Sequence, residues 1–129
     1  MFQIDKTFSF AASHSLTGLP EGHKCSRLHG HTYCVTVTVG SEEINGPGWV
    51  TDFADLKPFA AYIESLADHQ HLNDVLDVNP TAENLAYHLA QWFIAHVQPN
   101  IGGRLESVRV GESPTSGATY LAPSEADTR

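Results

Sequence analysis

Two long stretches in which apolar and polar residues alternate constrain the fold of this chain more than any other feature. In residues 2–14 the apolar side chains fall mainly at even positions, and in residues 31–39 a tyrosine and three valines take odd positions. Because successive side chains of a strand point to opposite faces of a sheet, this period predicts two strands with one buried face each. The segment from Gly18 to Gly30 is polar and turn-rich, so we expect a long loop joining an antiparallel pair.

Two segments in the middle of the chain carry apolar residues at helical spacing. The first predicts a helix from about residue 54 to 67, with Pro58 in its first turn. The second predicts a helix that begins at Pro80-Thr81, where the Thr81 hydroxyl can cap free amides. The buried stripe of this second helix should consist of Leu85, Ala86, Leu89, Trp92, Phe93 and either His96 or Val97.

Strand patterns return at residues 105–110 and 118–121. The order strand, strand, helix, helix, strand, strand predicts an α+β fold, a four-stranded antiparallel sheet with two helices on one face. A chain of 129 residues allows a single domain, which we place at residues 1–122. Residues 123–129 carry little that can pack, so we expect a flexible C-terminal tail.

Composition and charge exclude several classes of protein. Lys and Arg total 7 against 15 Asp and Glu, a net charge of -8, whereas nucleic-acid binders are usually basic. No apolar run reaches the roughly 18 residues of a membrane span. The amino terminus, residues 1–6, lacks the features of a signal peptide, and the chain has only two cysteines. We therefore expect a cytoplasmic protein without disulfides.

Histidine is unusually frequent, with eight residues against seven Lys plus Arg. His29 and His31 flank a glycine and point to the same side of an extended segment, while His14 ends the neighbouring strand, so the three can converge. Three imidazoles and an open fourth position are typical of a catalytic zinc site, since a structural site takes four protein ligands. The alternative is that His29 and His31 are ordinary polar residues of a loop.

Cys25 favours the metal site over that alternative. It lies four residues before His29 and is either a fourth ligand or a nearby base. Its neighbours Lys24 and Arg27 would favour the thiolate. His23, in the same loop, is a further candidate ligand.

For three other side chains, the surrounding sequence does not by itself indicate a functional role. Asp68 precedes His69, and a carboxylate that meets an imidazole can act with it as a proton relay, although such pairs are also common on surfaces. Glu112 follows a strand, where an exposed carboxylate is the ordinary case. Cys34 faces away from His31 along the strand, and we predict a buried structural thiol.

Motifs of other metal and nucleotide proteins are missing. The sequence has no His-Glu-x-x-His, Cys-x-x-Cys, phosphate loop or Gly-x-Gly-x-x-Gly. A cupin-type barrel would need a glutamate soon after His-x-His, and residues 33–36 supply none. Zinc-protease, zinc-finger, cupin and nucleotide-fold interpretations therefore lose support.

Five motifs, in register over residues 2–121, resemble the 6-pyruvoyltetrahydropterin synthase family. The three residues between the cysteine and His-Gly-His resemble its 6-carboxytetrahydropterin synthase branch in particular. The motifs are Phe10-Ala11-Ala12-Ser13-His14, Cys25-x-x-x-His29-Gly30-His31, Trp49-Val50-Thr51-Asp52-Phe53-x-x-Leu56-Lys57, Asp68-His69-x-x-Leu72-Asn73 and Asn79-Pro80-Thr81-x-Glu83-Asn84-Leu85.

The resemblance implies a zinc-dependent lyase. Its substrate would be 7,8-dihydroneopterin triphosphate, and its products 6-carboxytetrahydropterin, acetaldehyde and triphosphate, on the route to 7-deazaguanine and queuosine. One alternative is 6-pyruvoyltetrahydropterin synthase, which eliminates triphosphate but keeps the carbon side chain. Another is a non-catalytic module of the same fold that binds zinc or a pterin.

The resemblance also implies roles for individual residues. A neighbouring subunit would contribute the relay, and Thr81 would lie near the pterin. Proximity to Cys25 suggests that Lys24, Arg27 and His23 offset the charge of the triphosphate. By the same resemblance, His14, His29 and His31 would hold Zn²⁺, and Cys25 would accept a proton. Asp68 and His69 would form the relay. Glu112 would bind the pterin ring and take part in the relay.

The fold implied by the resemblance is the tunnelling fold. Subunits of this fold join their sheets into a barrel, commonly a hexamer built as a dimer of trimers, with active sites at subunit interfaces. Such joining covers sheet edges that are otherwise exposed. Two positions depart from the family's pattern beside Glu112: Gly111 stands where lysine is frequent, and Ser113 where threonine is usual.

Overall fold

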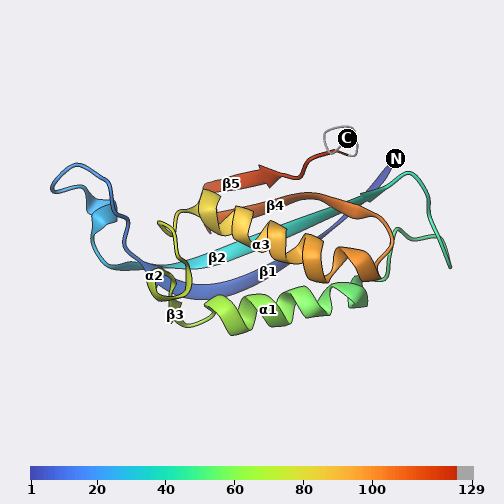
Figure 1. Ribbon diagram of the computed structural model, residues 1–129, viewed down its shortest axis with the longest axis horizontal. Coiled ribbons are helices and arrows are strands. Elements are labelled where there is room, and N and C mark those ends of the chain that lie inside the picture. Colours follow the sequence, from blue (N-terminus) through green and yellow to red (C-terminus); the bar gives the residue numbers. More distant parts are fainter. Residues whose placement is uncertain (125–129) are drawn as a thin grey trace.

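Both alternating segments form strands in the computed structural model, which describes residues 1–124 (Figure 1). The predicted tail, residues 123–129, lies outside the described residues from position 125 onward. The strands are β1 (Phe2–His14), β2 (His29–Ser41), β3 (Gln70–His71), β4 (Arg104–Ser113) and β5 (Ser116–Leu121). The α-helices are α1 (Lys57–Ala67), α2 (Leu72–Val75) and α3 (Ala82–His96), and the 3-10 turns are η1 (Lys24–Ser26), η2 (Phe53–Leu56) and η3 (Gln98–Asn100).

The strands form one sheet in the order β3-β1-β2-β4-β5. The four predicted strands are confirmed, and each pairs with its neighbour in antiparallel fashion. The sheet has in addition the short strand β3, which runs parallel to β1 beside Ala12 and Ser13. Two residues are too few to show an alternating pattern, so the sequence could not reveal β3.

The register between β1 and β2 positions the histidines. His14 pairs with His29, and Ala12 pairs with His31. Because directly opposed residues of an antiparallel pair share a face, His14, His29 and His31 all point to the same side. The long hairpin therefore determines where the candidate ligands meet.

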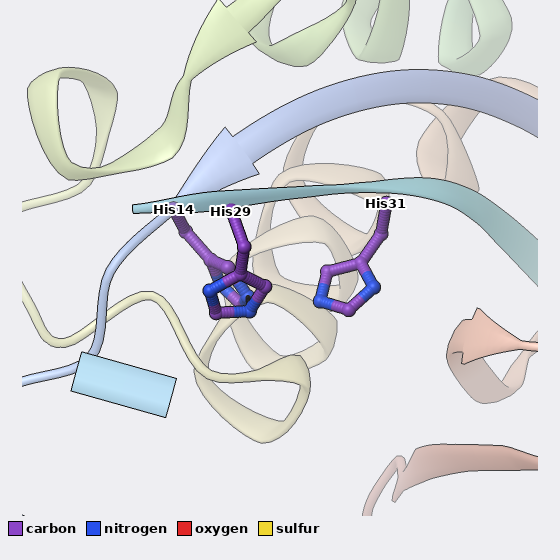
Figure 2. Close-up of side chains that lie close together, drawn as sticks. All are labelled: His14, His29 and His31. Carbon is purple, nitrogen blue, oxygen red and sulfur yellow. Dashed lines mark hydrogen bonds between the residues drawn. The ribbon is translucent and has the colours of Figure 1, made fainter. Parts of the chain in front are cut away.

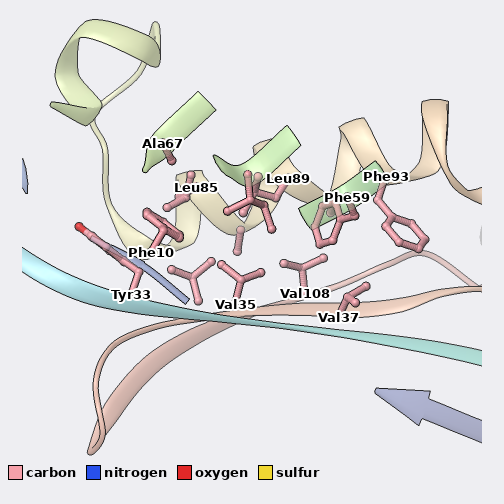
Figure 3. Packing of buried hydrophobic residues seen from close by; sticks show 14 of the residues in the cluster. Phe10, Tyr33, Val35, Val37, Phe59, Ala67, Leu85, Leu89, Phe93 and Val108 are labelled. Atoms are coloured by element: carbon pink, nitrogen blue, oxygen red, sulfur yellow. The ribbon is translucent and has the colours of Figure 1, made fainter. Parts of the chain in front are cut away.

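Helices α1 and α3 lie side by side on one face of the sheet and bury its apolar side chains (Figures 1 and 3). The predicted first helix is a 3-10 turn followed by α1, with Pro58 in the first turn, where its missing N–H costs no bond. The Thr81 hydroxyl caps α3 by accepting from the Asn84 N–H at 3.1 Å. None of the helices in residues 1–124 has both the length and the apolar composition that a membrane span requires.

The buried stripe of α3 is largely the predicted one. Leu85, Ala86, Leu89 and Phe93 are buried, and Val97 rather than His96 continues the stripe. Trp92 is only half-buried because it lies at the margin of the helix layer, where it stacks on Tyr62 with ring centroids 3.9 Å apart.

The prediction for Cys34 was wrong. Its side chain is exposed, and its Sγ lies 3.6 Å from the Ser9 hydroxyl on the neighbouring strand. Both long helices cover the opposite face of the sheet, so within residues 1–124 the face that carries Cys34 has no layer over it. Burial of one face does not imply burial of the other in an antiparallel sheet.

Candidate metal centre and active site

Three imidazoles converge where β1 ends and β2 begins (Figure 2). One ring nitrogen from each of His14, His29 and His31 lies within 4.8 Å of those of the other two. The ring centroids are 4.5 to 5.1 Å apart, and the rings meet edge to face. The structure thus brings together the three residues that the sequence singled out as ligands.

Backbone carbonyls determine which nitrogen of two rings carries the proton. His14 Nδ1 lies 2.8 Å from the Pro80 carbonyl oxygen, and His29 Nδ1 lies 2.7 Å from that of Arg27. A carbonyl only accepts hydrogen bonds, so each Nδ1 donates and each Nε2 presents a lone pair. Such outer bonds are what orient the histidine ligands of metal sites.

The free nitrogens fit a cation. The Nε2 atoms of His14 and His29 are 3.0 Å apart, so two lone pairs face each other. His31 Nε2 is buried and has no hydrogen-bond partner among the described residues. A buried polar atom without a partner requires an explanation, and a metal ion at the convergence point would satisfy all three nitrogens.

Burial controls the protonation of the residues around this centre. The pKa of His14 lies below its ordinary value, chiefly because the side chain is buried. Its imidazole therefore favours the neutral form, which is the form that binds metals. Burial and the negative charge of Glu112 raise the pKa of Tyr33, so the phenol stays protonated.

Tyr33 is a residue of the site that the sequence analysis missed. Its hydroxyl lies 3.2 Å from His14 Nδ1, and its fully buried ring packs edge-on against His14 and His31. The signal was available, because Tyr33 follows His31 by two residues and so shares its face of the strand.

Glu112 lies near the histidines, on β4. Its Oε2 is 3.9 Å from His31 Nε2, and its side chain is half-buried. A carboxylate in this place can face a ligand bound beside the metal centre. It is not among the side chains whose ligand atoms converge with those of the three histidines, so the geometry gives no support to it as a fourth ligand.

Cys25 lies in η1, next to the end of β1. Its carbonyl accepts from the Leu16 N–H at 2.9 Å, and its own N–H donates to His23 Nδ1 at 3.1 Å. Neither Cys25 nor His23 joins the converging nitrogens in the described part of the chain, so the geometry gives no support to either as a fourth ligand. Lys24 and Arg27 are exposed on the same loop.

Asp68 and His69 do meet in space, at the edge of β1. His69 Nδ1 lies 3.1 Å from Asp68 Oδ2, and Asp68 Oδ1 accepts from the Ala11 N–H at 3.1 Å. The bond from Ala11 and the contact with His69 hold the pKa of Asp68 below its usual value. The His69 side chain is 82% exposed, and the pair is not part of the converging histidine group of the same chain.

Comparison with known proteins places this arrangement in a family. The family model described as 6-pyruvoyl tetrahydropterin synthase matches residues 3–123. This chain belongs to that family.

Two relatives in the 6-pyruvoyl tetrahydropterin synthase family bear the name 6-carboxy-5,6,7,8-tetrahydropterin synthase. The one from Synechocystis is 39% identical over 132 residues and covers 95% of each chain. The one from Bacillus subtilis is 31% identical over 129 residues, which is 92% of this chain and 84% of the relative. The structure of Caenorhabditis elegans 6-pyruvoyl tetrahydropterin synthase superposes with a TM-score of 0.80 at 25% identity, covering 95% of this chain and 96% of that one.

Gly111 and Ser113, the two positions beside Glu112 that depart from the pattern of the 6-pyruvoyl tetrahydropterin synthase family, lie at an irregularity in the pairing of β4 with β5. The register of β4 against β5 shifts between Gly111 and Ser113. The Arg109 guanidinium lies over the glycines, because a Cβ on Gly117 would lie 2.7 Å from its Cζ and a Cβ on Gly111 3.0 Å from its Nη1. A side chain at position 111 would therefore compete with Arg109 for space.

Two asparagines in the family's motifs hold the segment that follows β1. Asn73 accepts from the N–H of Ser15 at 2.9 Å and donates to its carbonyl at 2.8 Å. Asn79 makes the same pair of bonds with Thr17, at 3.1 and 3.0 Å. Thr81 lies next to Pro80, the residue that orients His14, but its own hydroxyl is engaged as the cap of α3.

Proposed function

We propose that this chain catalyses the reaction of a 6-carboxytetrahydropterin synthase. It would convert 7,8-dihydroneopterin triphosphate and water into 6-carboxytetrahydropterin, acetaldehyde and triphosphate, for 7-deazaguanine and queuosine synthesis. The observation that carries the proposal is the convergence of three imidazole nitrogens, one of them buried without a partner, in a chain 39% identical to a relative of that name.

His14, His29 and His31 would hold Zn²⁺. Three neutral imidazoles suit zinc, and the fourth position stays open to substrate, as catalytic zinc requires. When bound, zinc would act as a Lewis acid toward the side-chain hydroxyls of the substrate and acidify the neighbouring C–H or O–H. The thiolate of Cys25 would accept the proton, because a base of modest strength then suffices.

Asp68 and His69 would complete the site of a neighbouring copy. The support is that His69 is 82% exposed at a sheet edge and apart from the histidine group of its own chain. Within the described residues β1 pairs with β3 only at Ala12 and Ser13, so most of its outer edge is open. Among residues 1–124 no strand pairs with the outer edge of β5 either, and copies that join these edges would form the barrel, as a dimer of trimers.

Glu112 would bind the pterin. An ionised carboxylate accepts two parallel hydrogen bonds, which matches the amino and ring N–H donors of a pterin. Its position 3.9 Å from His31 Nε2 would put the pterin ring beside the metal. Thr81 would lie near the ring, and the exposed Lys24, Arg27 and His23 would offset the charge of the triphosphate on an otherwise acidic protein. Both cysteines are free thiols, in keeping with a reducing cytoplasm.

Product analysis tests this proposal. Zinc-loaded protein is incubated without oxygen with 7,8-dihydroneopterin triphosphate, and pterins and acetaldehyde are measured. We expect 6-carboxytetrahydropterin with acetaldehyde, and loss of both in Cys25→Ala. Cys34→Ala is the matched control, because Cys34 is the second free cysteine and lies on the open face of the sheet. A pyruvoyl product without acetaldehyde would assign the sister activity, and bound zinc without turnover would leave a binding module.

A further inference from the structure

His69 has a backbone conformation that L-residues rarely adopt. Its φ is +58°, and it is the sole non-glycine residue with positive φ among residues 1–124. In this left-handed region Cβ crowds the backbone carbonyl, so the conformation is disfavoured. Such a strained conformation persists only where the surrounding structure holds it in place, and strained conformations are frequent at functional sites.

Two bonds to Ala11 fix the turn on its N-terminal side. Asp68 Oδ1 accepts from the Ala11 N–H, and the His69 N–H donates to the Ala11 carbonyl at 2.6 Å. The imidazole of His69 itself is 82% exposed, so no packing holds it. The direction in which it points therefore depends on the backbone around it and on its contact with Asp68.

A second pair of side chains fixes the turn on its C-terminal side. The Ser13 hydroxyl lies 3.0 Å from His71 Nδ1, and β3 pairs with β1 at Ala12 and Ser13. His71 follows His69 by two residues, and neither the candidate metal centre nor the proposed relay uses it. The turn at His69 is thus held by consecutive residues of β1, on the strand that ends in the ligand His14.

We propose that Ser13 and His71 form a clamp that positions His69 for proton transfer in the neighbouring copy, an inference that rests on the proposed function. His71 acts through His69 and is a positioning residue. Its Nδ1 is engaged by Ser13, and its bond to β1 prevents the strained turn from relaxing. The clamp gives the exposed imidazole a defined direction before another copy or a substrate meets it.

Steady-state kinetics of the zinc-loaded, full-length protein test the clamp. Ser13→Ala and His71→Ala should each lower kcat about tenfold or more with KM unchanged, because small misplacements of a catalytic group are costly. The double variant should be no worse than either single one, since both remove one interaction. His71→Asn should restore most of kcat, as its amide can still bond to Ser13. Ser9→Ala, on the same strand and facing the same way, should match the wild type.

The remaining outcomes separate the clamp from other roles. If the variants have a lower melting temperature but an unchanged kcat, the contact between Ser13 and His71 is structural only. If Ser13→Ala loses zinc, Ser13 acts on His14 instead. Either result overturns the clamp. If His69→Ala keeps full kcat, the relay fails and the clamp with it, and a wild type without turnover refutes the proposed function itself. Crystal structures of both alanine variants give a readout without turnover: an unchanged turn at His69 would also overturn the proposal.

Discussion

The Nε2 atoms of His14 and His29 lie 3.0 Å apart, although a backbone carbonyl holds the proton of each ring on its other nitrogen. When both rings are neutral, one ring must give up its carbonyl bond or two lone pairs must face each other. A cation bound between the two nitrogens would remove this unfavourable contact.

Removal of the zinc that we propose for this site should lower the stability of the protein. A ligand that binds only the folded state stabilises it by about 4 kcal/mol at a thousandfold excess over its Kd. We expect the melting temperature to fall on treatment with a chelator and to recover when zinc is added back. The melting temperature of His31→Ala should be the same with and without zinc. An unchanged melting temperature of the wild type after verified zinc removal would contradict this account.

Tyr33→Phe should weaken zinc binding without removing a ligand. The Tyr33 hydroxyl lies 3.2 Å from His14 Nδ1, and loss of such an outer contact typically reduces metal affinity about tenfold or more. Competition with a chromophoric chelator measures the change. Tyr62→Phe is the control, because the Tyr62 hydroxyl bonds to His88 on the helix layer, and its zinc affinity should equal that of the wild type. If the wild type, Tyr33→Phe and Tyr62→Phe bind zinc with equal affinity, the Tyr33 hydroxyl does not support the metal site.

Glu112→Gln should impair the reaction and leave the metal in place. A hydrogen bond to a charged group contributes about 1.5 to 3 kcal/mol, so kcat/KM should fall roughly ten- to a hundredfold. Zinc content should stay at the wild-type level, since Glu112 is not part of the converging histidine group. Glu106→Gln, on the same strand, serves as control. A loss of zinc from Glu112→Gln would mean that the carboxylate supports the metal rather than the pterin.

Mixed assemblies should reveal an active site shared between copies. Cys25→Ala and His69→Ala should each be inactive. When they are unfolded and refolded together, some sites will combine an intact Cys25 with an intact His69 from the other variant. Activity should then return above that of either variant alone. No recovery in verified mixed assemblies would place both residues in the site of a single chain.

His88 should make the stability of the fold depend on pH. Burial lowers its pKa below the ordinary value, partly offset by the charge of Asp77, so the unfolded chain takes up a proton more readily than the folded one. The free energy of unfolding therefore decreases as pH falls through the ordinary histidine range, about 6.5, toward the lowered pKa. The advantage of the wild type over His88→Phe should be smaller at pH 5 than at pH 8. Equal differences at both pH values would contradict the lowered pKa, which an NMR titration of His88 measures directly.

Alternation in the sequence was sufficient to predict the long hairpin and therefore the meeting of His14 with His29. Contacts over long separations were not predictable. The bond from His14 to the Pro80 carbonyl spans 66 residues, and no local pattern encodes it. Cys34 was assigned to the wrong environment because period two identifies the two faces of a strand but not which of them is covered. The strand that contains His71 was not predicted because it is only two residues long.

The paired bonds from Asn73 to Ser15 and from Asn79 to Thr17 hold the chain just after His14, where the loop that precedes β2 begins. The chain is fastened on one side of this loop by the asparagines and on the other by the β1 and β2 pairing at His29. Since closing a longer loop costs only slightly more entropy, residues between Thr17 and Arg27 can be added or removed while the asparagine bonds and the Arg27 carbonyl that orients His29 stay in place. The length of the loop around Cys25 can therefore change while the hairpin keeps the three imidazoles together.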